Sequence, residues 1–168
     1  MSKKNIFLEK KLKKNDYETI WFDSEKNISV IKPIPIKNYV SISNIILTEN
    51  IDLNNIYTLF IKNDEKYVSK PLEYYKIFTN DIISIWRPIP KTHYISLGDI
   101  IKSGNEKPDD VYCINEDYVE EYNYYNVKLY ETDDFTLWRM NLYNTFIVSL
   151  SKYPSRVLKY KPKKNIFL

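Results

Sequence analysis

The sequence predicts a single all-β domain over residues 1–168, arranged as a pseudo-threefold, β-prism-like fold of three repeats. Three features favour this fold: a recurring segment, alternation of apolar and polar residues, and a high content of aromatic residues (16 Tyr, 7 Phe and 3 Trp). A two-sheet β-sandwich is the alternative, because short irregular strands at this spacing also suit that architecture.

The recurring segment is the strongest of these features. ISVIKPIP at 28–35 returns as ISIWRPIP at 83–90, an offset of 55 residues, and FTLWRMNL follows at 135–142. Tyr39 then aligns with Tyr94, and Phe146 is the predicted counterpart in the third copy. Three copies with similar flanks indicate an internal repeat rather than chance.

The repeat divides the chain into units of about residues 21–76, 77–128 and 129–168. The third unit is short, and residues 1–20 are the candidate segment to complete it. The hexapeptide KKNIFL stands at both 3–8 and 163–168, which favours a ring closed by the two termini. Coincidence in a Lys- and Asn-rich composition is the alternative explanation of the identical ends.

Local patterns favour strands almost throughout. Apolar and other residues alternate along 83–89, the period expected of a strand. The two Pro-Ile-Pro segments, 33–35 and 88–90, are expected to end strands, because proline lacks the backbone N–H of a sheet ladder. Residues 8–15 form the clearest helix-like window.

The residue inventory argues against an enzyme. The chain has one cysteine, Cys113, one histidine, His93, and two glycines, Gly98 and Gly104. These numbers exclude an intrachain disulfide, the usual cysteine- or histidine-rich metal sites and glycine-rich phosphate loops. No cofactor or metal is expected, and the net charge of +3 predicts only a weak overall field.

Residues 83–113 contain Trp-Arg-Pro-Ile-Pro at 86–90, a segment at 94–99 with a Leu-Gly pair, and a further segment that follows Gly104. In these features they resemble the vacuolar protein sorting-associated protein 62 family. Thr92-His93 replaces the Pro-Gly of the family, and the first and third units depart further. The resemblance implies an accessory module of sorting or membrane-associated machinery, without catalysis.

Five residues are candidates for ligand binding, because exposed aromatic rings beside arginines stack on sugars or lie at lipid headgroups. The competing interpretation is structural: the tryptophans pack between sheets and the arginines bind backbone carbonyls. The five residues are Trp86, Arg87, Tyr94, Trp138 and Arg139.

Lysines near both termini are candidates for contact with an anionic membrane surface. A solubilising edge is the alternative role. The residues are Lys11, Lys13, Lys14, Lys161, Lys163 and Lys164.

The predicted function is therefore a non-enzymatic binding module that recognises a membrane, glycan or protein surface. Its alternative is a self-assembling structural protein, viral or from an inclusion, in which the chain forms a homo-oligomer. Nucleic acid is not expected as a partner, because no recognised binding motif is present. No secretory signal or membrane span is evident, so a cytoplasmic protein, peripheral to membranes, is expected.

Overall fold

The computed structural model describes residues 6–48, 56–122, 125–154 and 157–163. Within these ranges the chain forms strands and loops, with one 3-10 turn at Glu116–Tyr118 and no α-helix. The all-β prediction is confirmed. The strands form five three-stranded sheets and one two-stranded sheet, so a two-sheet sandwich does not describe them. Among the described residues no helix has the length and hydrophobicity needed to cross a bilayer.

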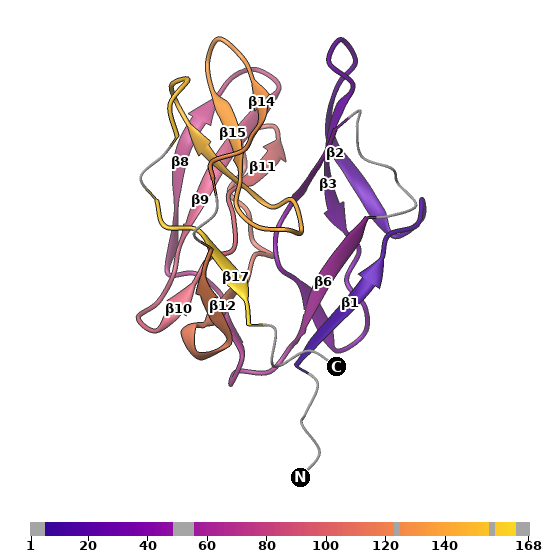
Figure 1. Ribbon diagram of the computed structural model, residues 1–168, viewed down its shortest axis with the longest axis vertical. Helices are drawn as coiled ribbons and strands as arrows, with labels where there is room; N and C mark the ends of the chain where they lie inside the picture. The colour runs from indigo at the N-terminus through magenta and orange to yellow at the C-terminus, as the bar shows by residue number, and fades with distance from the viewer. Residues whose placement is uncertain (1–5, 49–55, 123–124, 155–156, 164–168) are drawn as a thin grey trace.

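Three of the sheets share one strand order and are called here the hairpin sheets. Each consists of a β-hairpin and a later third strand that pairs with the second strand of the hairpin. The first two lie on opposite sides of the molecule, and the third lies beside the second (Figure 1). They are β2 (Tyr17–Asp23), β3 (Ile28–Pro33) and β5 (Ile45–Leu47); β8 (Glu73–Thr79), β9 (Ile83–Ile89) and β11 (Ile100–Ser103); and β14 (Lys128–Glu131), β15 (Thr136–Arg139) and β16 (Phe146–Ser149).

All three hairpins have a register shift at the same place. It lies just before Trp21, Phe78 and Tyr130, which pair with Val30, Ile85 and Leu137. Such a bulge increases the local twist of a strand. The repeat in the sequence therefore extends to an irregularity of the backbone.

The hairpin sheets enclose one hydrophobic core. Each sheet contributes buried residues from matching positions of its second and third strands, so apolar alternation in three separate segments serves a single core. The matching sets are Ile28, Ile83 and Phe135; Val30, Ile85 and Leu137; and Ile46, Ile101 and Val148.

The other three sheets are called here the linking sheets, because each joins strands that flank different hairpin sheets. β7 and β13 lie ahead of the hairpins β8–β9 and β14–β15, and pair with strands that follow them, β12 and β17. β1, at the N-terminal end, pairs with β6 in the same way. The linking sheets are β1 (Phe7–Lys11), β6 (Tyr57–Lys62) and β4 (Tyr39–Ser41); β10 (Tyr94–Ile95), β12 (Cys113–Asn115) and β7 (Val68–Ser69); and β13 (Val119–Glu121) and β17 (Tyr160–Pro162).

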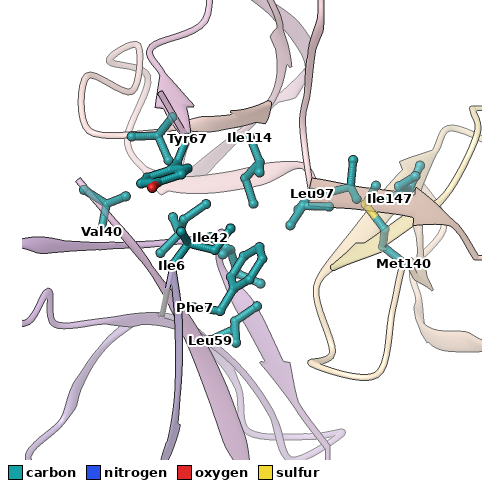
Figure 2. Close-up of a cluster of buried hydrophobic side chains, with 13 residues drawn as sticks. Ile6, Phe7, Val40, Ile42, Leu59, Tyr67, Leu97, Ile114, Met140 and Ile147 are labelled. Carbon is teal, nitrogen blue, oxygen red and sulfur yellow. The ribbon is translucent and has the colours of Figure 1, made fainter. Parts of the chain in front are cut away.

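A second core fills the space between the linking sheets (Figure 2). Ile6 and Phe7 enter it from the N-terminal segment, and Tyr160 of β17 packs against it. The helix-like window at 8–15 is therefore strand in its first part: five residues of β1 pair with β6. Pairing with a neighbour satisfies the backbone here, and this tertiary effect outweighs a weak local helix propensity.

In each hairpin sheet a backbone N–H of the third strand donates to a residue just ahead of the third strand of a neighbouring hairpin sheet. Ile101 N–H donates to Asn44 Oδ1 at 2.9 Å, and Val148 N–H donates to Asp99 Oδ2 at 2.8 Å. The third such bond runs from Ile46 N–H to the carbonyl oxygen of Asn144, at 3.0 Å. Each sheet is thus bound to the next at a matching position.

Some details of the predicted repeat differ from the structure. Phe146 is not the counterpart of Tyr94, because it pairs with Arg139 at the start of β16. The loop before it is shorter: Leu137 pairs with Val148, 11 residues later, whereas Ile85 pairs with Ile101, 16 residues later.

The predicted unit boundaries at 76/77 and 128/129 fall within β8 and β14. The first hairpin sheet begins with Tyr17, four residues before the predicted start of the first unit. Pro88 lies inside β9 rather than after it. It is accommodated because β9 pairs with β11 only from Ile83 to Trp86, so the missing N–H is not needed on that side.

Candidate functional site

Two clefts lie at matching positions between neighbouring hairpin sheets. The first, called here the apolar cleft, has a volume of about 510 Å³ and lies between the second and third sheets. The second, the polar cleft, has a volume of about 250 Å³ and lies between the first and second sheets. Their linings correspond: Lys32, Ser41 and Asn44 in the polar cleft match Arg87, Ser96 and Asp99 in the apolar cleft.

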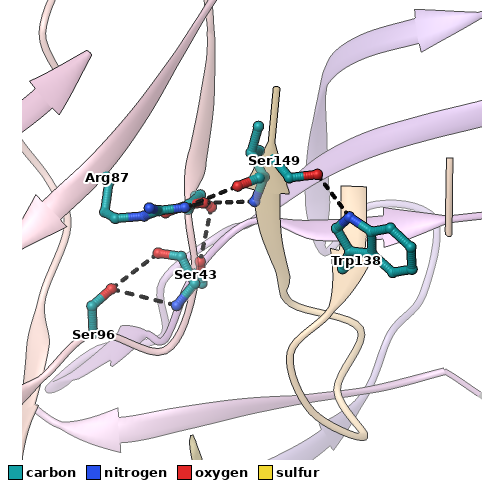
Figure 3. Close-up of polar contacts among 8 residues, drawn as sticks. Ser43, Arg87, Ser96, Trp138 and Ser149 are labelled. Atoms are coloured by element: carbon teal, nitrogen blue, oxygen red, sulfur yellow. Dashed lines mark hydrogen bonds and ion pairs between the residues drawn. The ribbon is translucent and has the colours of Figure 1, made fainter. Parts of the chain in front are cut away.

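An ion pair between Arg87 and Asp99 forms part of the lining of the apolar cleft, and Figure 3 shows the contacts of Arg87. Arg87 donates from Nε and Nη2 to the two carboxylate oxygens of Asp99, at 2.9 and 2.8 Å, and from Nη2 to the Val148 carbonyl at 3.0 Å. Burial raises the pKa of Asp99, and the hydrogen bonds from Arg87 and Val148 N–H oppose that shift. Both charges are thus used internally, and neither is free for a ligand.

Aliphatic and aromatic side chains form the walls of this cleft. Tyr75 on β8 is 61% exposed, and Val157 and Leu158 before β17 are 40% and 56% exposed. Pro88 and Pro90 also line this cleft, and Pro88 lies on β9, the strand that pairs with the strand of Tyr75. Exposed apolar residues gathered in one concavity are typical of a binding site, whereas single ones are ordinary.

The polar cleft has charged walls. Lys32 forms an ion pair with Asp110, and Glu18, Asp109 and Lys102 lie around it. Lys32 therefore uses a different partner from its counterpart Arg87, which binds the carboxylate of Asp99. In the matching place of Asp99 stands Asn44, which is 5% exposed.

The two predicted tryptophans lie within the fold. Trp86 is 7% exposed, donates from Nε1 to Ser84 Oγ at 2.8 Å, and is covered by Lys76, whose Nζ lies 5.0 Å from the ring centroid. Trp138 is half-buried and donates from Nε1 to Ser149 Oγ at 2.9 Å. In this conformation Trp86 offers little surface on which a sugar could stack.

The other three predicted residues lie in different places. Arg87 lines the apolar cleft. Tyr94, on a linking sheet, donates from its hydroxyl to the Glu65 carbonyl at 3.2 Å. Arg139 is half-buried, and its Nε has no hydrogen-bond partner among the described residues. The structure therefore does not gather the five residues into one site.

The lysines form two separate groups. Lys11, Lys13 and Lys14 are exposed at and beyond the end of β1. Lys161 lies on β17 with Nζ 3.5 Å from Glu120 Oε1, and Lys163 follows it. Lys164 lies outside the described residues. β17 pairs with β13, whereas the first group lies at and beyond the end of β1, which pairs with β6.

Tyr75, Val157, Leu158, Asn44 and Asp99 are cleft residues that the sequence analysis did not select. For two of them the sequence contains a signal: Asn44 and Asp99 are polar residues at the same repeat position, each followed by two isoleucines. The others come from segments remote in sequence, whose proximity only the fold creates.

Comparison with known proteins finds similarity in structure but not in sequence. No protein-family model matches the chain, and no curated protein matches it in sequence. The crystal structure of GNIP1Aa from Chromobacterium piscinae is similar, with a TM-score of 0.67 and 15% sequence identity over 89% of this chain. The match covers 34% of GNIP1Aa, so this chain spans about a third of that protein's length. The chain therefore shares the β-rich fold of part of GNIP1Aa.

Proposed function

We propose that this chain is a non-enzymatic binding module whose apolar cleft receives an apolar side chain of a protein partner. The supporting observation is the cleft itself: about 510 Å³, walled by exposed Tyr75, Val157 and Leu158. Cavities of this size with mostly apolar walls are the usual form of binding sites.

The chemistry of the cleft favours a protein partner over a glycan. A glycan requires polar groups that are free to bind its hydroxyls, whereas Arg87 and Asp99 in the lining of the cleft bind each other and Val148. A membrane surface would engage the lysines, and Lys11, Lys13 and Lys14 do not line this cleft. The resemblance to the vacuolar protein sorting-associated protein 62 family supports an accessory role and stays a prediction.

The buried thiol is consistent with a module that has no catalytic chemistry. Cys113 is fully buried, and burial raises the pKa of its thiol to about 12, so it is protonated at neutral pH. A thiol in that state is a poor nucleophile.

Self-assembly is the second candidate, with another copy of this chain as the partner. β8 is an edge strand of seven residues, and its Tyr75 also forms part of the cleft wall. An unpaired strand edge beside an apolar surface is a common site of association between copies.

An apolar fluorescent probe, 1-anilinonaphthalene-8-sulfonate, tests whether the cleft accepts an apolar group. Leu158→Glu is expected to weaken probe binding by about tenfold, because it places a charge in the cleft wall. Leu150→Glu is the matched control, since Leu150 is 60% exposed, close to the 56% of Leu158, and does not line the cleft. Equal binding by both variants would contradict the proposed site.

Light scattering after size exclusion, over a concentration series, separates the two candidates. Growth in mass that Leu158→Glu abolishes would favour self-assembly over a different protein partner. Co-elution with anionic vesicles that depends on Lys11, Lys13 and Lys14 would favour a membrane surface and count against the proposal.

A further inference from the structure

The polar cleft contains a side-chain amide donor that has no partner within the described chain. Asn44 lines the cleft and is 5% exposed. Its Oδ1 accepts from Ile101 N–H at 2.9 Å, which fixes the orientation of the amide. Its Nδ2 makes no hydrogen bond with any part of the chain that the structure describes. This nitrogen is not one of the fully buried unpaired atoms of the described residues, so it is accessible from the cleft and can donate to a bound ligand.

Comparison with the apolar cleft explains why this donor is free. There the Asp99 carboxylate accepts from Arg87 and from Val148 N–H, so neither of its oxygens lacks a partner. In the polar cleft Lys32 binds Asp110 instead. Asn44 Oδ1 thus binds the next sheet, and Asn44 Nδ2 stays without a partner in the described chain.

The surrounding groups define the chemistry of a ligand. Glu18 and Asp109 provide carboxylate acceptors, Lys102 provides a cationic donor, and Ser41 and Ser103 carry hydroxyls that do both. Because the lining carries charges of both signs, it does not favour a simple ion as the ligand. Among the described residues no group of three acidic, histidine or cysteine side chains could hold a metal.

We infer that the polar cleft binds a small polyhydroxylated ligand of the sugar class, with the Asn44 amide donating to a ligand hydroxyl. Each sugar hydroxyl can both donate and accept, which suits a lining that mixes carboxylates, ammonium groups and serines. Ile20 and Ile100 in the same cleft provide apolar contacts for the C–H faces of a ring. This site is separate from the apolar cleft and does not depend on the function proposed for it.

Titration of the ¹⁵N-labelled chain with methyl glycosides of glucose, galactose, mannose and N-acetylglucosamine, followed by NMR, tests the inference. At least one glycoside is expected to shift the amide signals of Ile101 and Ser103, with millimolar affinity. Asn44→Asp keeps the acceptor for Ile101 N–H and removes the donor, so it is expected to weaken binding at least tenfold.

Asn105→Asp is the matched control, since it makes the same substitution at an exposed position outside the cleft lining. Binding that Asn44→Asp weakens and Asn105→Asp retains supports the inference. Glycosides that shift no cleft signal, or that bind Asn44→Asp as well as the original chain, would overturn it. Circular dichroism of each variant confirms that a loss of binding does not reflect unfolding.

Discussion

The two clefts occupy matching places between neighbouring hairpin sheets, yet they differ in chemistry. Arg87 and Asp99 neutralise each other in the lining of the apolar cleft. Their counterparts, Lys32 and Asn44, do not interact: Lys32 binds Asp110, and Asn44 binds the neighbouring sheet. The hydrogen bond from the following strand, to Asn44 in one cleft and to Asp99 in the other, is the feature they share.

The hydrogen bond between neighbouring sheets is the structural part of the repeat. The bond between sheets is required at every junction, so a side-chain oxygen acceptor is kept at both Asn44 and Asp99. At the third junction the Asn144 carbonyl replaces the side chain. The groups that face the clefts have no such constraint, and the two linings differ: one is mostly apolar and the other carries charges.

The largest expected effect comes from Asp99→Ala. It leaves Arg87 and Val148 N–H without their acceptor in a buried place, and we expect the free energy of unfolding to fall by about 3–5 kcal/mol. Urea denaturation followed by circular dichroism measures this. Asp99→Asn, which copies the residue of the polar cleft, is expected to lose less. A loss below about 1 kcal/mol for Asp99→Ala would show that the pair does not hold the sheets together.

Gly98→Ala tests the close approach of the three sheets beside the apolar cleft. A Cβ on Gly98 would lie 2.9 Å from Ser43 Oγ and 3.2 Å from both the Phe146 carbonyl oxygen and Thr145 Cβ. Gly98 also has a φ of +155°, so we expect a loss of about 1–3 kcal/mol from overpacking together with backbone strain, measured by the same denaturation. Gly104→Ala is the control, because nothing lies within 4 Å of its added Cβ and only its φ of +77° opposes the change. Equal losses would assign the effect to backbone angle alone.

Asn44→Ala removes the junction bond on the polar side. It leaves the buried Ile101 N–H without an acceptor, and we expect a loss of about 1–2 kcal/mol in the free energy of unfolding. The loss is smaller than for Asp99→Ala because no charge is left unpaired. The comparison fails if Asn44→Ala destabilises the chain as much as Asp99→Ala does.

The smallest effect is expected for Lys32→Met. The Lys32–Asp110 pair is exposed to solvent, with side chains 33% and 45% accessible, and such pairs contribute at most about 1 kcal/mol. The difference in stability between the original chain and Lys32→Met should become smaller from low to high salt, because salt screens exposed charges. A loss comparable to that of Asp99→Ala would mean that the polar cleft also depends on its ion pair.

Much of the fold could be predicted from the sequence. Alternation in 83–90 and the recurrence of that segment indicate strands and a repeat, and the structure contains an all-β fold with repeated sheets. The residues of the candidate site could be predicted less well than the fold. The sequence makes Trp86 a candidate for ligand binding, but the same pattern places it inside a sheet, where it is 7% exposed.

The fold class and the matching strands around 28–33, 83–89 and 136–139 follow from the sequence, because the period of the apolar residues decides which side of a strand is buried. The contacts between segments that are distant in the chain follow from the tertiary structure. Val157 and Leu158 join Tyr75 in one cleft across some 80 residues of chain, and Asp110 reaches Lys32 in the other. These contacts depend on how the sheets pack against one another, and local sequence patterns do not predict that packing.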